Sequence, residues 1–420
     1  MKRLDEIKGD RVKRLKGLVR IGASIPVAAV LIAGTAAISR AASASSSSSP
    51  YRVFAIEPLS GPLATYAKAE LDGLRAAASA VNSNGGVDGH KIILTSANDS
   101  FDLPTAISLV TEAAESSRPP NMVVAGVDGS ETQAVMPILE QHKIVSIESA
   151  APPNPASDPY NFESNVSAQT TDAVLSKVIQ TKGYKSIGLL TPSNELGDVT
   201  ATAVSADLKN EGIQVSAATY PPGATSVSSE LSQLEASKPQ ALVVSALGAD
   251  AGVVTTSRAQ LNIKIPTYGD DAYSTSDVGS LVPAADLDNI FLQVPKVGVY
   301  QSSFEQTPEF ATFFKALKAA IPGEPSLAIG TFASTYDSIA SLAVAADQAK
   351  SISPTSITHA LLNLRLNDHN NLVVSVHPLQ YSTTTHAELS STSLTEVPAS
   401  DPQTDGFVGL KAGVTPNPAG

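Results

Sequence analysis

The sequence predicts an α/β protein whose chain folds into two lobes, each built on a doubly wound parallel sheet. From residue 51 onward, short apolar runs alternate with stretches in which apolar residues recur every three or four positions. The first pattern is typical of buried strands, and the second of helices that pack one face against a sheet. The alternation stops at a proline-rich stretch, residues 151–159, and then starts again, and a chain of 420 residues is too long for one ordinary core. Two such runs indicate two parallel sheets, each covered by helices on both faces.

The first run of elements ends at the proline-rich stretch. Leu63, Leu71 and Leu74 belong to an apolar series with helical spacing. Pro62 suits the first position of that helix, because its missing N–H would be unpaired there anyway. The expected strands cover residues 52–56, 91–96, 122–127 and 144–148. The expected helices cover residues 63–81, 104–115 and 131–142.

The second run follows the same pattern. Its expected helices cover residues 168–181, 198–211, 227–237 and 249–261, and its expected strands cover residues 186–190, 214–220, 241–245, 265–268 and 290–294. Beyond it we expect helices at residues 326–349 and 355–364 and strands at residues 372–376 and 393–397. We assign residues 51–164 plus 296–370 to the N-terminal lobe and residues 165–295 plus 371–410 to the C-terminal lobe. Residues 411–420 are expected to form a loose tail.

The composition excludes several classes of site. The chain has no Cys, so it holds no disulfide, thiolate metal site, cysteine nucleophile or lipidated Cys of a bacterial lipoprotein. Its net charge is −12 although eight of the first twenty residues are basic. The rest of the chain therefore repels phosphate backbones, and nucleic acid is not expected as a partner. The sequence contains no Walker loop, H-E-x-x-H motif or nucleophile–base set, so we expect no catalytic residues, no cofactor and no metal.

The N-terminus indicates export. Residues 21–39 carry no charge and follow the basic run, and residues 42–44 fit the A-x-A pattern that precedes a signal cleavage site. We therefore assign residues 1–44 to a signal peptide and the Ser-rich residues 45–50 to a flexible leash. An uncleaved membrane anchor is the alternative, because residues 21–39 are just long enough to span a bilayer. Both interpretations place the body outside the cytoplasm, in the periplasm or at the cell surface.

The expected ligand site lies at the strand ends. In open α/β sheets, ligands bind beyond the carboxyl ends of the strands. That rule directs attention to five loops, at residues 57–62, 128–130, 149–152, 191–197 and 269–273. The loops come from both lobes, so we expect a cleft between the lobes to be the binding site.

Four stretches of the sequence carry a family resemblance. In chain order they read LSGPLATYAKAELDGLRAAASAVNSNGGVDGHKI, AGVDGSETQAVMPILEQHKIVSIESAAP, IGLLTPSNELGDVTATAVSADLKNEGIQV and IPTYGDDAY. In that order they resemble the periplasmic branched-chain amino-acid (leucine–isoleucine–valine) binding protein family. The resemblance implies a type I periplasmic-binding fold, with two doubly wound parallel-sheet lobes joined by a hinge of three crossings.

The resemblance also implies a place for the ligand's carboxylate. Gly129 and Ser130 match the loop that holds it, at the start of the helix expected over residues 131–142. A helix N-terminus offers free N–H groups and the positive end of a dipole, which supports this assignment. Ser130 either adds its hydroxyl to the ligand or serves only as a helix cap. Ser149 and Ala151 match a second loop, where the family often places a Thr hydroxyl on the ligand and Ala151 has none to donate.

Three further positions follow from the same resemblance. Asp271 falls where the family has an acidic residue that pairs with the ligand's ammonium group, and Asp270 is either the alternative partner or a solvated turn residue. Tyr66 matches an aromatic residue that lines the pocket, although packing against the sheet would also explain it. Leu196 stands where the family commonly has Tyr, and residues 246–248 lack an aromatic often found there. These departures indicate a pocket shaped for another side chain.

These observations together predict a solute-binding protein of an ABC importer, with no enzymatic activity. It would bind a small amino-acid-like ligand by hinge closure, act as a monomer, and have a membrane permease as its partner. A membrane-tethered ligand-sensing ectodomain on the same fold is the alternative, and it requires that residues 21–39 stay attached. An exported enzyme is the third hypothesis, and it would need a reactive constellation that the sequence lacks.

Overall fold

This computed structural model describes most of the chain beyond the N-terminal segment. The described residues are 49–150, 155–276, 278, 282–300, 307–323, 325, 327–366, 371–375, 379, 381–400, 403–404 and 406–409. The expected signal peptide, residues 45–48 of the leash, Ala151 and the tail at residues 411–420 lie outside them. Within the described parts, no helix combines the length and the apolar character needed to span a lipid bilayer.

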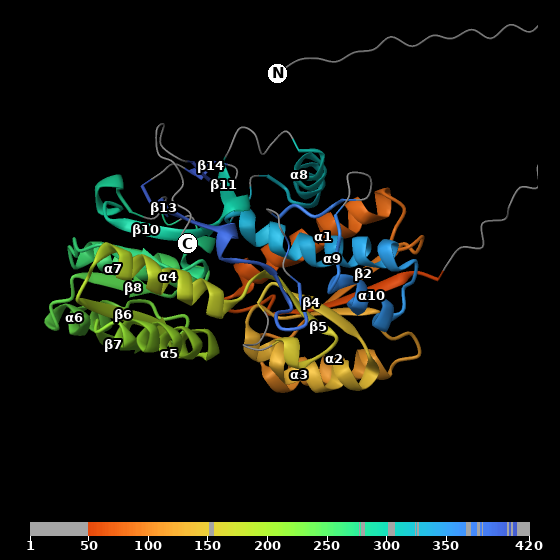
Figure 1. Ribbon diagram of the computed structural model, residues 1–420, viewed down its shortest axis with the longest axis horizontal. Coiled ribbons are helices and arrows are strands. Elements are labelled where there is room, and N and C mark those ends of the chain that lie inside the picture. The colour runs from red at the N-terminus through yellow and green to blue at the C-terminus, as the bar shows by residue number, and fades with distance from the viewer. Residues whose placement is uncertain are drawn as a thin grey trace, which may run out of the picture. The chain divides into compact units, whose positions relative to one another are not determined.

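The first lobe is built on a parallel sheet that has six strands in the described residues (Figure 1). Their order across the sheet is β12 (Ala387–Leu389), β5 (Asn161–Val166), β4 (Val145–Glu148), β3 (Met122–Ala125), β1 (Tyr51–Glu57) and β2 (Ile92–Asn98). Every residue of β3 and β4 is buried. Such short, fully buried strands are typical of a parallel sheet with both faces covered.

Helices cover both faces of this sheet. They are α1 (Ala64–Ser83), α2 (Leu103–Glu115), α3 (Gly129–His142), α8 (Pro308–Ala320), α9 (Ile329–Ala349) and α10 (Pro354–Leu361). The apolar residues of α2 and α3 form one buried cluster, and those of α1, α8 and α9 form another. Helices α1 and α9 lie side by side (Figure 1). Gly73 permits this close approach, because a Cβ there would lie 2.6 Å from the carbonyl oxygen of Phe332.

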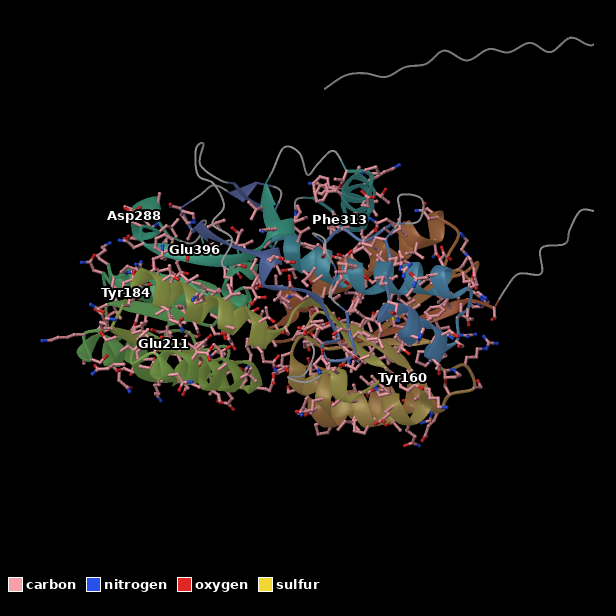
Figure 2. All side chains as sticks on the ribbon, viewed as in Figure 1. Tyr160, Tyr184, Glu211, Asp288, Phe313 and Glu396 are labelled. Carbon is pink, nitrogen blue, oxygen red and sulfur yellow. The ribbon has the colours of Figure 1, made fainter. Side chains whose placement is uncertain are left out.

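Helix α8 was not among the elements expected from the sequence. Its start carries clear signals, since the Thr307 side chain accepts a hydrogen bond from the Phe310 N–H (3.3 Å) and Pro308 occupies the first turn. Phe313 points into the core of the first lobe (Figure 2) and meets the ring of Tyr336 edge-on, with centroids 5.0 Å apart. The helix therefore belongs to the first lobe.

The second lobe repeats the arrangement. Its sheet has the order β13 (Leu394–Pro398), β10 (Ile290–Pro295), β9 (Thr267–Gly269), β8 (Ala241–Val244), β6 (Ser186–Pro192) and β7 (Gln214–Tyr220) in the described residues. All pairs are parallel except β10 with β13. Helices α4 (Ala168–Lys182) and α5 (Glu195–Asn210) pack on one face, and α6 (Ser228–Ala236) and α7 (Ala249–Gln260) on the other. A smaller sheet pairs β11 (Val299–Tyr300), β15 (Phe407–Gly409) and β14 (Gln403–Thr404).

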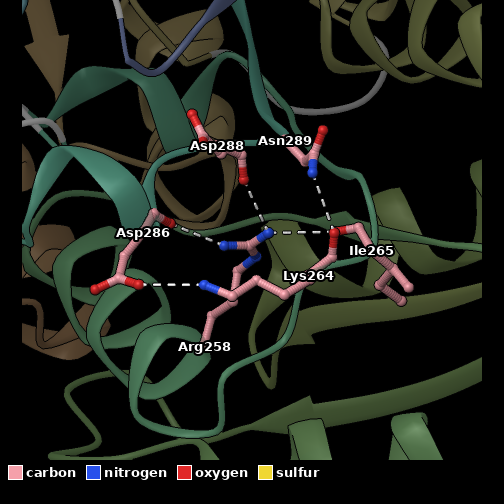
Figure 3. A network of polar contacts seen from close by, with 6 residues as sticks. All are labelled: Arg258, Lys264, Ile265, Asp286, Asp288 and Asn289. Carbon is pink, nitrogen blue, oxygen red and sulfur yellow. Dashed lines mark hydrogen bonds and ion pairs between the residues drawn. The ribbon is translucent and has the colours of Figure 1, made fainter.

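A buried arginine fixes the strand that leads to the second half of the site. Arg258 of α7 donates a hydrogen bond to Thr267 Oγ1 (3.0 Å) at the start of β9. It also donates to the carbonyl oxygen of Asp286 (3.0 Å), as Figure 3 shows. Its other guanidinium nitrogen donates to the carbonyl oxygens of Ile265 (3.2 Å) and Asp288 (3.3 Å). Burial lowers the pKa of Arg258, but four acceptors satisfy its N–H groups. The network holds α7, β9 and the segment before β10 together.

The chain passes between the lobes at three places. It leaves the first sheet after β5, returns after β10 to form α8 and α9, and crosses again between β12 and β13. Strand β12 lies beside β5, where the Glu163 N–H donates to the His386 carbonyl oxygen (2.9 Å). Assigning all of residues 371–410 to the C-terminal lobe is therefore wrong for β12. The pairing joins segments more than 200 residues apart, which no local pattern reveals.

The strand expected at residues 372–376 is also absent from the part of it that the structure describes, residues 371–375. The Asp337 carboxylate of α9 accepts hydrogen bonds from the backbone N–H groups of Val374 (2.8 Å) and Ser375 (2.8 Å). A buried side chain thus satisfies the amides that a neighbouring strand would otherwise pair.

Candidate functional site

The site lies where the strand order reverses in each sheet. In the first sheet β1 stands between β2 and β3, and in the second sheet β6 stands between β7 and β8. Connections leave such a point in opposite directions and open a crevice beyond the carboxyl ends of the strands. A cavity of about 120 Å³ occupies this position, and residues of both lobes line it.

The strand-end loops supply much of the lining. Asp128 and Gly129 follow β3, Ser149 follows β4, Leu196 lies after β6, and Asp271 follows β9. Four of the five loops expected from the strand-end rule therefore reach the cavity. None of residues 57–62, all of which the structure describes, is among the lining residues.

The remaining lining is largely apolar. Its main apolar contributors are Val166, Ala168, Val199, Leu247, Val294 and Pro295. Several of these lie next to a crossing between the lobes. Tyr66 is the one aromatic residue among the described residues that line the cavity. Its side chain comes from the first turn of α1 and is 9% exposed.

The predicted site residues are brought together with two exceptions. Tyr66, Gly129, Ser149, Leu196 and Asp271 all line the cavity. Ala151 lies outside the described residues, and Ser130 is not among the lining residues. Contact of these residues with a ligand stays a prediction.

Ser130 is engaged with the cap of its own helix. The Asp128 carboxylate accepts hydrogen bonds from the Ser130 N–H (2.9 Å) and from the Ser130 hydroxyl (2.5 Å). Asp128 is therefore the N-cap of α3, as short acidic residues commonly are. One backbone N–H of this helix start, that of Ser130, therefore pairs with a carboxylate of the protein itself.

The two adjacent aspartates after β9 have different surroundings. Asp270 is 2% exposed and accepts a hydrogen bond from the Tyr273 N–H (2.9 Å), so the interpretation of Asp270 as a solvated turn residue is wrong. Asp271 is half-buried and lines the cavity, which Asp270 does not. Burial raises the pKa of Asp271 to about 6.

A buried glutamate organises the first-lobe side of the cavity. The Ser149 hydroxyl donates to Glu70 Oε1, and Glu70 also shares a hydrogen bond with Tyr66. Burial raises the pKa of Glu70 to about 8, and the hydrogen bonds from Ser149 and Tyr66 oppose that rise. Glu70 thereby sets the orientation of two lining side chains. The helical spacing could have revealed its burial, because Ala67 and Leu74, three and four residues away, lie on the same apolar face of α1.

Carboxylates from opposite lobes lie close together at the cavity. Asp128 caps α3, and Glu195 is the first residue of α5. These two helices approach each other. Burial and the neighbouring Asp128 charge raise the pKa of Glu195 to about 7. The charged residues among the described lining residues are Asp128, Glu163, Glu195 and Asp271. Within the described residues, no group of acidic or His side chains is arranged to hold a metal ion.

Comparison with known proteins identifies relatives along most of the chain. A family model described as "Periplasmic binding protein" matches residues 50–401. The chain is 24% identical over 168 residues to a Leu/Ile/Val-binding protein from Citrobacter freundii. That match covers 39% of this chain and 45% of the relative, so it spans less than half of the curated relative's length.

Solved structures share the fold over almost their whole length. The branched-chain amino acid transporter substrate-binding protein of Streptococcus pneumoniae, in complex with isoleucine, has a TM-score of 0.69 at 20% identity, covering 86% of this chain and 97% of that chain. A solute-binding protein of an ABC transporter from R. palustris, in complex with benzoate, has a TM-score of 0.69 at 17% identity, covering 83% and 92%. The expected fold, two α/β lobes with mostly parallel sheets, is therefore confirmed.

Proposed function

Because the chain belongs to the periplasmic binding protein family, we propose that it is an extracytoplasmic solute-binding protein of an ABC importer. It binds a small amino-acid-like or related solute between its lobes, closes around it, and presents the closed form to a membrane permease. It acts as a monomer and releases the solute chemically unchanged. Residues 1–44 serve as its export signal.

The observation that carries this proposal is a cavity shared by two lobes. Gly129 and Ser149 reach it from the first lobe, and Leu196 and Asp271 reach it from the second. A solute that contacts both sets of residues binds more tightly when the lobes are closed. It therefore shifts the population toward the closed form by the difference in its affinity for the two states.

The lining supports a ligand with an apolar part and an amine. Tyr66, Leu196 and Leu247 offer apolar surface, and Asp271 offers a carboxylate at the second-lobe wall. The two similar structures described above hold isoleucine and benzoate, respectively. Since the same fold binds such different solutes, the side chains of the cavity decide which ligand this chain takes.

Thermal unfolding tests the proposal. The exported body is screened against amino acids, amides, short peptides, polyols and aromatic acids. A ligand at about one hundred times its dissociation constant adds about 2.7 kcal/mol of stability. We expect at least one solute to raise the melting temperature, and Leu196→Arg, which fills the cavity mouth with a charged side chain, to abolish that shift. No shift with any solute would contradict the proposal.

Two further measurements separate the proposal from its rivals. Recovery of the bound solute unchanged after incubation distinguishes a binding protein from an exported enzyme. Determination of the mature N-terminus distinguishes a released binder, which starts near Ser45, from a tethered sensor that retains residues 21–39.

A further inference from the structure

The charged side chains among the described residues that line the cavity are all acidic. Asp128 and Glu163 reach it from the first lobe, and Glu195 and Asp271 reach it from the second. No Lys, Arg or His is found among the described residues that line it. A ligand carboxylate would enter this lining without a cationic side chain to meet it, whereas a cationic group would find acceptors on both walls.

The protein itself already uses part of the usual place for a ligand anion. The Asp128 carboxylate takes up the N–H and the hydroxyl of Ser130 at the start of α3. Asp128 itself is 4% exposed, and its second oxygen, Oδ2, has no hydrogen-bond partner among the described residues. A buried carboxylate oxygen at a cavity wall is costly to leave unpaired, and an N–H donor of the ligand would satisfy it.

The hydroxyl groups of the lining also favour a donor. Ser149 donates its hydrogen to Glu70, Ser274 to the Asp271 carbonyl oxygen, Thr275 to the Ala272 carbonyl oxygen, and Ser334 to the Thr331 carbonyl oxygen. Each of these hydroxyl hydrogens is therefore already used, and Thr275 Oγ1 also accepts a hydrogen bond from the Gly248 N–H (3.3 Å). Thr171 Oγ1 and Thr331 Oγ1 are buried without partners in the described residues and can accept as well as donate. The cavity as a whole is rich in acceptors.

Two of the carboxylates repel each other across the lobes. Asp128 belongs to the first lobe and Glu195 to the second, and α3 and α5 approach each other there. Like charges in this position oppose closure, and a cation between them removes the repulsion and adds attraction on both sides. Closure would then depend on the charge of the ligand and not only on its apolar contacts.

From this geometry we propose that the ligand is an organic cation, a small protonated alkyl amine that needs no carboxylate, held by Asp128 and Glu195 at the lobe boundary and by Asp271 on the second lobe. The inference rests on the proposed solute-binding function and narrows its substrate class. It departs from zwitterionic ligands, because no cationic side chain among the described lining residues meets their acid end.

Calorimetric titration with cadaverine, lysine, norleucine and hexanoate tests the inference, because these compounds share an alkyl chain and differ mainly in charged groups. We expect affinity to fall in that order, by about tenfold at each step as one favourable charge contact is lost or one unfavourable contact is added. Asp128→Asn keeps a good helix cap and should weaken cadaverine by at least about thirtyfold. Glu211→Gln, at an exposed position at the end of α5 and outside the cavity, should leave the affinity unchanged.

The outcomes distinguish a failure of the cation preference from a failure of the proposed solute-binding function. Tighter binding of norleucine or hexanoate than of cadaverine would overturn the cation preference and leave the solute-binding function intact. Binding of a neutral or anionic solute from the wider screen, with none of the amines bound, would do the same. An equal loss in Asp128→Asn and Glu211→Gln would overturn the role of Asp128. A failure of every compound in both sets would remove the proposed function itself.

Discussion

Replacing Glu131 with glutamine is expected to stabilise the protein at neutral pH. Glu131 lies in the first turn of α3, fully buried, where its Oε2 accepts a hydrogen bond from the Val127 N–H (2.8 Å). Burial and the neighbouring Asp99 carboxyl raise the pKa of Glu131 to about 10. The side chain is therefore a neutral acid in the folded protein at pH 7, and glutamine has nearly the same shape. The glutamine oxygen can still accept from Val127, and its amide can donate toward Asp99.

The expected gain follows from the difference between the folded and unfolded states. The unfolded chain loses this proton near pH 4.5, and the folded chain keeps it up to about pH 10. Between these values the folded state binds more protons, so the free energy of unfolding falls as the pH rises. A tenfold change in proton activity is worth about 1.4 kcal/mol, so wild type loses up to about 3 kcal/mol between pH 4.5 and pH 7. Glu131→Gln does not titrate and escapes this loss.

Urea unfolding at pH 4.5 and at pH 7 measures the effect. Glu131→Gln should match wild type at the lower pH and exceed it by up to about 3 kcal/mol at the higher pH. Glu140→Gln, on the exposed side of the same helix, is the matched control and should show no such pH-dependent gain. A variant that is less stable than wild type at pH 7, or a difference that does not change with pH, would refute the reasoning.

The other predictions concern the cavity and its support. Asp271→Asn should weaken an amine ligand by at least about thirtyfold in calorimetry, because one member of a buried charge pair is lost. Amine affinity should fall by about tenfold or more from pH 8 to pH 5, because protonation of Asp271, with its pKa of about 6, and of Glu195, with its pKa of about 7, removes the charges that hold the cation. Gly126→Ala should destabilise the fold by about 2–5 kcal/mol in urea unfolding, because Gly126 has φ +78° and an added Cβ would lie 2.5 Å from the Glu131 Cβ.

Each of these three predictions has a result that would contradict it. A loss below about threefold in Asp271→Asn would show that Asp271 is not the ammonium partner. An amine affinity that is constant from pH 8 to pH 5 would exclude Asp271 and Glu195 as the main contacts. Gly183→Ala gives the comparison for Gly126→Ala, because Gly183 also has positive φ (+77°) but an added Cβ there meets nothing within 4 Å. Equal destabilisation by the two changes would show that the contact with Glu131 has no effect.

Local sequence patterns predicted much of the fold. The helix expected at residues 168–181 and the strand expected at residues 214–220 match α4 (Ala168–Lys182) and β7 (Gln214–Tyr220) closely. Periodicity works for α4 because it buries one helix face, and for β7 because its buried residues, Ala218 and Tyr220, lie two positions apart on one face of the strand. It missed α8, and it suggested a strand at residues 372–376, where the carboxylate of Asp337 binds the backbone amides.

For the candidate site, the strand-end rule and the family resemblance indicated the loops but not their charge balance. Asp128 and Ser149 follow strands of the first sheet and Asp271 follows a strand of the second, so the sequence places them at the carboxyl edges of the two sheets. The burial of Asp270 depends on the folded surroundings. The hydrogen bond between Ser149 and Glu70 and the approach of Glu195 to Asp128 join residues far apart in the chain. No short-range pattern carries that information.

The sequence by itself determined the alternation of strands and helices, the division into two lobes and the loops that face the cleft, because these depend on the spacing of apolar residues along a short segment. The tertiary structure decided which carboxylates are buried, which hydroxyl hydrogens are already used, and that no basic side chain reaches the cavity in the described residues. Charge and hydrogen bonding act through space, so the pairing of distant segments, such as β12 with β5, sets them only once the chain has folded.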